Sequence, residues 1–331
     1  MATSKQVITP SNALKKPLPP TRWQTFQQAV LRGRTIVISI PYLWLILFFL
    51  LPFLIILYTS FQDLAADQVH LLPLLNLADI ETAELKLKLS SYMLLFTDSY
   101  YWSSYVTSLK YAAVTTILCL ILGYPFAYFL TRMSKKTQLI MLIGIMIPFW
   151  TSFLLRVYAW RGLLDSKSGW FGSILQSLNI DQFLIDIGLI SMEGLYAQSP
   201  MSLTLGMVYT YLPFMILPLY GTLSKLDNRL LEAAQDLGAT PWTTFWKVTI
   251  PLTKTGIVAG SMLVFIPCVG EYVIPTLLGD PKTLMIGNVL YIEFAKNTDW
   301  SMACALAVVM IALIIIPLNI FNQTMAKGEK K

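Results

Sequence analysis

The feature that most constrains the fold of this chain is a set of six long apolar runs. Each run is about as long as the 20 residues that an α-helix needs to cross a bilayer. In lipid, backbone groups find partners only within a helix or a closed barrel, and these runs are too long and uniformly apolar for barrel strands. They predict six transmembrane helices, near residues 36–58, 108–130, 139–160, 202–223, 256–274 and 302–321.

The composition indicates a polytopic membrane protein. Of the 331 residues, 56% are hydrophobic and 13% are charged, whereas about 25% are charged in soluble domains. We do not interpret the first run as a cleaved signal peptide, because 35 mostly polar residues precede it and no small-residue cleavage site follows. Cys119, Cys268 and Cys304 lack CxxC spacing and His70 lies in a loop, which argues against a disulfide framework and a metal site.

Charge bias between the loops predicts the orientation. Cytoplasmic loops are enriched in Lys and Arg. A basic excess marks the N-terminal segment, the turn "TRMSKK", the loop after the fourth run and the C-terminal tail. With six spans these segments share one side, so we expect both termini in the cytoplasm. The expected organisation is a partly disordered cytoplasmic N-terminus at 1–35, a transmembrane domain at 36–323 containing a cytoplasmic loop at 224–254, and a cytoplasmic tail at 324–331.

The loops on the opposite side are acidic, so the net charge of +6 reflects topology and does not support nucleic-acid binding. Two of these outer loops are long, at 61–105 and 161–200. The second contains "WFGSILQSLNIDQFLIDIGL", whose apolar residues recur at helical spacing but are interrupted by Asp181 and Asp186. We therefore predict short helices on the outer surface rather than a seventh span.

The loop between the fourth and fifth runs has the residues of a short helical elbow. Asp227 or Asn228 can cap a first helix, and Gly238 stands where a left-handed C-cap residue is expected. Thr240 can cap a second helix with Pro241 in its first turn, and we expect this helix, "PWTTFWKV", to end before Pro251. The alternative, a solvated connector, would leave four large apolar groups without a partner: Leu231, Trp242, Phe245 and Trp246.

The spacing in this loop resembles that of permease subunits of ATP-binding-cassette importers. Their pattern is Glu-Ala-Ala, three residues, Gly, nine residues, Ile, one residue, Leu-Pro. Here Val248 and Ile250 replace the family's Ile and Leu, and the spacing is intact. The resemblance implies that the loop docks on a cytoplasmic ATPase subunit through these residues: Glu232, Ala233, Ala234, Asp236, Gly238, Pro241 and Pro251.

The resemblance also implies the fold, the cofactors and the partners. We expect an all-α membrane protein with the MetI-like permease fold of type I importers. The chain has no GxxxxGK[ST] phosphate loop, so ATP and Mg²⁺ would be bound by the ATPase and this chain would bind no cofactor and act as no enzyme. The expected partners are an ATPase pair, a second similar permease, a periplasmic binding protein and membrane lipid.

Several stretches resemble the polyamine permeases of this family, the putrescine permease in particular. These include "IPFWTSFLLRVYAWRGLL" and "SMLVFIPCVGEYVIPTLLG". A polyamine path should offer carboxylates and aromatic faces. Candidate path residues are therefore Glu271, Tyr272, Trp150, Tyr158 and Trp160. Glu271 could instead meet water at headgroup level, and the aromatic residues could be ordinary interfacial belt residues.

Arg156 is unfavourable for a cation path unless a carboxylate neutralises it, and Glu271 or Asp165 could pair with it. Three other hypotheses remain open. The chain could serve an importer of a different small solute, act alone as a secondary transporter, or be an intramembrane enzyme. The secondary transporter leaves the elbow unexplained, and no HExxH, GxSxG or paired-aspartate motif supports an enzyme.

Overall fold

The computed structural model describes residues 33–62, 89–164, 170–178, 180–190 and 196–328. These residues form helices and connecting turns and contain no β-strand. The chain divides into two units, Met1–Ile55 and Ile56–Lys331, which we describe separately. Four parts of the predictions lie outside the described residues: residues 1–32 of the predicted N-terminal segment 1–35, His70, most of the acidic first outer loop, and Asp165.

The described part of the first unit is one apolar helical run. It comprises α2 (Gly33–Leu45), the π-helical segment η1 (Ile46–Leu50) and the first turn of α3 (Leu51–Thr59). Its large apolar side chains are exposed, for example Val37 and Phe49. A helix with such a surface needs lipid or another protein around it. The window Val37–Thr59 is long and apolar enough to span a membrane, as predicted for the first run.

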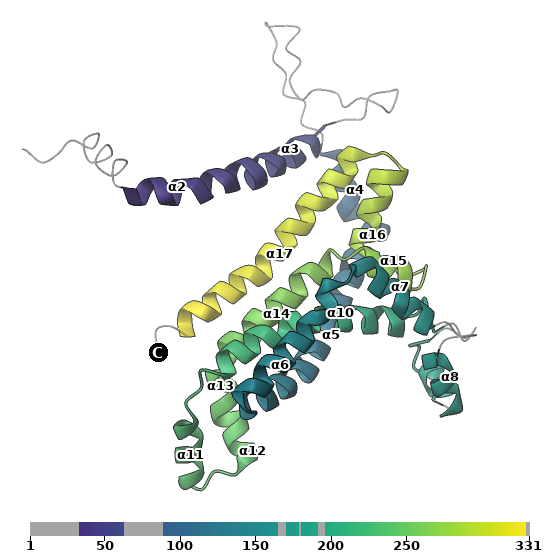
Figure 1. Cartoon of the computed structure of the whole chain (residues 1–331). Helices are drawn as coiled ribbons and strands as arrows, with labels where there is room; N and C mark the ends of the chain where they lie inside the picture. Colours follow the sequence, from purple (N-terminus) through teal and green to yellow (C-terminus); the bar gives the residue numbers. More distant parts are fainter. Residues whose placement is uncertain (1–32, 63–88, 165–169, 179, 191–195, 329–331) are drawn as a thin grey trace, which may run out of the picture. The chain divides into compact units, whose positions relative to one another are not determined.

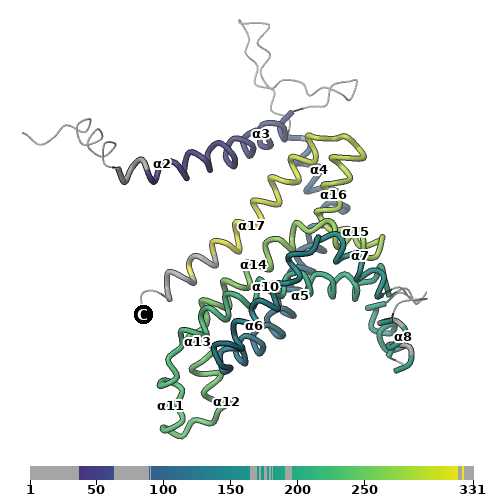
Figure 2. The backbone as a smooth tube through the Cα atoms, viewed as in Figure 1, coloured from purple at the N-terminus to yellow at the C-terminus, as the bar shows by residue number. Residues whose placement is uncertain are grey.

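Three helices form the core of the second unit: α5 (Ser99–Arg132), α10 (Pro200–Leu223) and α14 (Lys254–Val269). The backbone views in Figure 1 and Figure 2 show them side by side. Fully buried residues of this core include Cys119 from α5, Met215 from α10 and Cys268 from α14. The helices interlock through small and flexible side chains, as is common where helices pack within membranes.

Glycines allow α14 to approach α10 closely. Gly256 and Gly260 are four residues apart and share one face of α14. A Cβ atom at Gly260 would lie 2.8 Å from the sulfur and 3.1 Å from the carbonyl oxygen of Met215. A Cβ at Gly256 would lie 2.0 Å from the hydroxyl of Thr222. The contact between these helices therefore requires residues without side chains at both positions.

Two of the predicted spans are broken helices. The third comprises α6 (Lys135–Met146), the 3₁₀ turn η2 (Ile147–Trp150) and α7 (Phe153–Leu163), with a 92° bend. The fifth was expected to be continuous over 256–274, but α14 ends at Val269 and the chain resumes as α15 (Val273–Leu278). By length and composition four helices can cross a membrane, or up to six if two bent pairs, 135–163 and 241–269, each count as one span. The sequence analysis placed these spans but not the breaks within them.

The remaining elements flank this core. A second cluster joins α4 (Ser90–Thr97), the start of α5, α16 (Ile286–Tyr291) and α17 (Trp300–Gly328). Between α16 and α17 lies the π-helical segment η4 (Ile292–Lys296). The second outer loop contains α8 (Trp170–Ser177) and α9 (Asp181–Asp186), which confirms the predicted short helices.

Hydrogen bonds link the two basic segments that were predicted to share the cytoplasmic side. Gln138, buried near the start of α6, donates to the carbonyl oxygens of Thr131 and Met133 in the "TRMSKK" turn. Its side-chain oxygen accepts from the hydroxyl of Tyr220, 2.8 Å away near the end of α10. The turn and the start of the elbow loop therefore lie at the same end of the second unit, as the charge bias requires.

Candidate functional site

The elbow begins with α11 (Asn228–Asp236). The side chain of Asp227 accepts a hydrogen bond from the backbone N–H of Arg229 at 3.0 Å, which confirms one of the two expected caps. Leu231 is buried at 5% exposure. Glu232, Ala233 and Asp236 are exposed and Ala234 is half-buried. The helix therefore packs on one side and leaves most of its Glu-Ala-Ala residues exposed.

Gly238 forms the turn of the elbow. Its φ of +86° confirms the predicted left-handed conformation. The N–H of Gly238 donates to the carbonyl of Gln235 at 2.8 Å, and the N–H of Ala239 donates to the carbonyl of Ala234 at 3.0 Å. This pair of bonds is the Schellman motif. A Cβ on Gly238 would meet no atom within 4 Å, so the backbone conformation, and not crowding within this chain, favours glycine.

The second helix of the elbow starts as predicted but ends later. Thr240 caps α12 (Pro241–Thr244) by accepting from the N–H of Thr243 at 3.2 Å, with Pro241 in the first turn. The helix continues through the π-helical η3 (Phe245–Thr249) and α13 (Ile250–Leu252). Pro251 therefore does not terminate it. The π-helical segment η3 directly precedes this proline, and such a segment departs from the regular hydrogen-bond pattern that a proline interrupts. The 66° bend into α14 occurs after Leu252.

Aromatic rings attach the second elbow helix to α5. The ring of Phe245 contacts Tyr124 and Tyr128 edge-on, with centroid distances of 5.6 Å and 5.9 Å. Next to it, Trp242 is 71% exposed and Trp246 is 53% exposed. Phe245 thus anchors the elbow to the core, while the two tryptophans contact Phe245 and each other and leave a large part of their apolar surface exposed.

Glu271 occupies the break between α14 and α15. One carboxylate oxygen, Oε1, accepts from the backbone N–H groups of Tyr272, Val273 and Ile274 at 3.1, 3.0 and 3.4 Å. The other, Oε2, accepts from the hydroxyl of Tyr211. Glu271 therefore caps the chain that resumes after the break and ties it to α10. The residue could be identified from the sequence, but its capping role could not.

A line of aromatic rings connects Glu271 to the third span. From Tyr211, which donates to Glu271, the line continues to Phe214, whose ring centroid is 6.3 Å from that of Tyr211. Phe214 in turn contacts Phe149 edge-on, with a centroid distance of 5.3 Å. The guanidinium of Arg156 lies over Phe149 at 5.1 Å. Helical spacing alone could not single out Tyr211, Phe214 and Phe149, because many other aromatic residues occupy the same runs.

Arg156 does not form the expected pair with Glu271. The carboxylate of Glu271 is occupied by Tyr211 and backbone groups, and Arg156 has no ion pair with any described carboxylate. Its contacts are with the rings of Phe149 and Phe153, and its buried Nε atom has no hydrogen-bond partner among the described residues. The alternative partner, Asp165, lies outside the described residues.

The other predicted path residues do not converge on Glu271. Trp150 is 83% exposed and Tyr158 is 50% exposed. Trp160 is half-buried and packs against Tyr209 at 5.3 Å. Tyr272 stacks on Tyr291 at 4.8 Å. The exposure of Trp150 and Tyr158 is compatible with both the path interpretation and the interfacial-belt interpretation, so their role stays a prediction.

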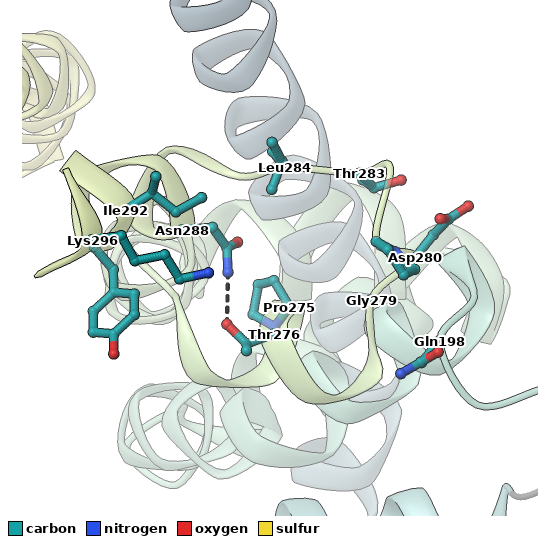
Figure 3. A pocket seen from close by; sticks show the side chains of 12 residues that line it. Gln198, Pro275, Thr276, Gly279, Asp280, Thr283, Leu284, Asn288, Ile292 and Lys296 are labelled. Atoms are coloured by element: carbon teal, nitrogen blue, oxygen red, sulfur yellow. Dashed lines mark hydrogen bonds between the residues drawn. The ribbon is translucent and has the colours of Figure 1, made fainter.

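A cavity of about 310 Å³ lies beside Tyr291, between α15 and α16 (Figure 3). The side-chain nitrogen of Asn288 donates to the hydroxyl of Thr276 at 2.7 Å across it, and Lys296 and Asp280 line it. None of the predicted path residues lines this cavity.

Glu293, in the nearby segment η4, is buried at 6% exposure and accepts from the hydroxyl of Tyr101 at 3.1 Å. This carboxylate could not be singled out from the sequence, because it lies between apolar runs rather than within one.

Among the described residues, no group of three or more His, Cys, Asp or Glu side chains could hold a metal ion. The distinctive features of the described residues are the capped elbow and the broken helices.

The chain matches the family described as "Binding-protein-dependent transport system inner membrane component" over residues 24–328. The chain belongs to this family. The permease is 35% identical over 288 residues to the "Spermidine/putrescine transport system permease protein PotB" of Escherichia coli (strain K12), covering 87% of the chain and 96% of that protein. It is 36% identical over 286 residues to the protein of the same name from Haemophilus influenzae, covering 85% and 91%.

Solved structures support the fold. The permease superimposes with a TM-score of 0.62 on a chain of a bacterial ABC transporter involved in the import of the acidic polysaccharide alginate. The sequence identity is 14%, and the match covers 90% of this chain and 99% of that one. Together with the family, this confirms an all-α, MetI-like permease. It is a transport component and a multi-pass protein of the inner membrane.

Proposed function

We propose that this permease forms half of the translocation path of an ATP-driven importer for a polyamine. A periplasmic binding protein would deliver the polyamine, a second permease would complete the path, and a pair of ATPase subunits would drive transport. The geometry of the elbow is the main observation that supports this proposal. It is capped at Asp227 and Thr240, turned at Gly238, and presents an exposed Glu232.

The elbow is suited to receive a force from another protein. Its two short helices have their N-terminal N–H groups capped and its turn has a defined hydrogen-bond pattern, so it resists deformation. The exposed tryptophans Trp242 and Trp246 offer apolar anchor groups of the kind that dominate protein interfaces. In the proposed importer this surface contacts the ATPase, which binds ATP and Mg²⁺, while this chain binds no cofactor.

The substrate is proposed from the chemistry of the α10 region and from the relatives. A polyamine carries several ammonium groups, which bind to aromatic faces and to carboxylates. Phe149, Phe214 and Tyr211 form a line of rings that ends at the carboxylate of Glu271. Phe214 is 37% exposed, so its ring is accessible. The relatives named as spermidine/putrescine permeases favour the same class of substrate.

A different small solute is the second candidate, since the same fold occurs in an importer of an acidic polysaccharide. The fold therefore does not determine the substrate. A stand-alone secondary transporter is less well supported, because it gives no role to the elbow.

Reconstitution tests these alternatives. The permease would be purified with its partner permease and ATPase pair, placed in proteoliposomes and supplied with the binding protein. We expect ATP-dependent uptake of radiolabelled putrescine or spermidine. Uptake of sulfate or iron without polyamine uptake would overturn the proposed substrate. Ion-driven flux through the isolated chain would overturn the importer itself.

A further inference from the structure

A second cavity, of about 250 Å³, lies at the end of the second unit where the elbow begins. The ends of α5 and α10 and the starts of α6 and α11 enclose it. Gln138, Ser224 and Asn228 contribute polar groups to its lining, and Arg132 and Lys135 contribute positive charge. The substrate path and the Glu-Ala-Ala face of the elbow do not explain this cavity.

The two cations in this cavity lack a neutralising group. Arg132 donates to the hydroxyl of Tyr128 at 3.0 Å and lies over its ring at 5.0 Å. Lys135 donates to the side-chain oxygen of Gln138 at 3.5 Å. No carboxylate lines the cavity. Asp227, the acid next to Asn228, caps α11 instead. Two positive charges that share one cavity with only neutral partners favour binding of an anion.

The surroundings of the cavity indicate where the anion comes from. Next to Tyr128 on α5, Phe129 is 65% exposed, and next to Gln138 on α6, Leu139 is 60% exposed. The cavity thus lies where apolar, exposed helix surface gives way to the charged "TRMSKK" turn. This is the arrangement that a phospholipid needs, with acyl chains against apolar side chains and a phosphate beside Lys and Arg.

We propose that this cavity binds the phosphate headgroup of an anionic phospholipid. The planar guanidinium of Arg132 supplies paired N–H donors for phosphate oxygens, and the ammonium of Lys135 supplies a compact positive charge. Since Asn228 is the first residue of α11, the bound lipid would join the "TRMSKK" turn to the root of the elbow. The site is independent of the transported solute.

Lipid titration of the purified full-length chain, followed by native mass spectrometry, tests the proposal. We compare phosphatidylglycerol with phosphatidylcholine for the wild type and for the double variant Arg132→Gln/Lys135→Gln. Each of the two cations that line the cavity should contribute about a fivefold gain in affinity for anionic lipid. The double variant should therefore lose roughly 25-fold in its preference for phosphatidylglycerol. Lys136→Gln is the matched control, because Lys136 is exposed in the same turn but does not line the cavity.

Two further arms separate the possible outcomes. Arg132→Lys keeps the charge and should retain most of the preference, and Lys135→Gln alone should lose about fivefold, which provides a test if the double variant does not fold. Equal losses in the double variant and in Lys136→Gln would overturn the site. Displacement of the lipid by millimolar inorganic phosphate would indicate a site for the free ion. If the double variant bound lipid like the wild type but no longer associated with the ATPase, the cavity would be assigned to a protein contact. Either result would overturn the lipid proposal.

Discussion

Replacing Glu271 with Gln separates its capping role from a role in the substrate path. The amide oxygen of Gln can still accept from the N–H groups of Tyr272, Val273 and Ile274, which Glu271 now caps. The fold should therefore lose only about 1–2 kcal/mol, because the bonds remain but their acceptor is no longer charged. A substrate ammonium would lose a charge-assisted hydrogen bond, worth about 1.5–3 kcal/mol. We therefore expect putrescine uptake to fall by roughly 10- to 100-fold.

The assay is ATP-driven uptake of radiolabelled putrescine into proteoliposomes, normalised to incorporated complex, with the melting temperature measured in parallel. Glu271→Ala is the structural control. It leaves four donors without their acceptor, at about 1–3 kcal/mol each if buried, and should reduce the amount of folded protein. Tyr211→Phe removes one bond and keeps the charge, and should lower uptake far less than Glu271→Gln. Uptake by Glu271→Gln within twofold of wild type would refute the path role. A fall in uptake that only matched a fall in the amount of incorporated complex would refute it too.

Three further outcomes follow from the packing and the backbone. Gly238→Ala should lower ATP-driven uptake because a left-handed conformation costs alanine about 1–2 kcal/mol. Gly238→Asn should retain most of the uptake, because asparagine tolerates this conformation. Wild-type uptake by both variants would contradict the requirement for this turn. Gly260→Leu should lower the melting temperature by several degrees through overpacking of about 1–3 kcal/mol, while Gly144→Leu, where no atom lies within 4 Å of the added Cβ, should not. Arg156→Met should leave the melting temperature of the chain in detergent unchanged or higher, because it removes a buried Nε donor without a hydrogen-bond partner among the described residues. A clear decrease would show that the contacts of Arg156 with the rings of Phe149 and Phe153 outweigh this unpaired donor.

The elbow could be predicted in detail because its signals are local. Gly238 is needed for one backbone conformation, and Asp227 and Thr240 bond to groups two or three residues away. Such interactions lie within a few residues of sequence and do not depend on the rest of the fold. Only the end of the second helix differs from the prediction, because Pro251 follows the π-helical segment η3 and does not stop the helix.

The broken spans could not be predicted, because proline alone does not locate a break in a transmembrane helix. Pro213 and Pro218 lie inside the continuous helix α10, whereas Pro148 lies at the 92° bend of the third span. In membranes, neighbouring groups can satisfy the backbone that a proline frees. The break after Val269 likewise depends on Glu271 capping the next turn and on Tyr211, 60 residues away in sequence.

The substrate path was predicted by residue type, and residue type does not specify the neighbours of a side chain. Trp150 and Tyr158 are exposed, whereas Phe214 and Phe149 lie on the line toward Glu271. All of these are aromatic residues in apolar runs, and tertiary packing alone distinguishes them. The missing pair of Arg156 and Glu271 has the same cause, because the sequence cannot show that backbone groups occupy the carboxylate.

The bend at Thr253 has a mechanical consequence. Thr253 is fully buried, and its hydroxyl shares a 2.9 Å hydrogen bond with the hydroxyl of Tyr124 on α5. This bond holds the junction in place while the helical segment Pro241–Leu252 extends from it. That segment is about 18 Å long at 1.5 Å per residue, so a displacement of ~3 Å at its far end is a rotation of roughly 10° about Thr253. Because Gly256 and Gly260 place α14 directly against α10, both helices would turn together as one rigid lever.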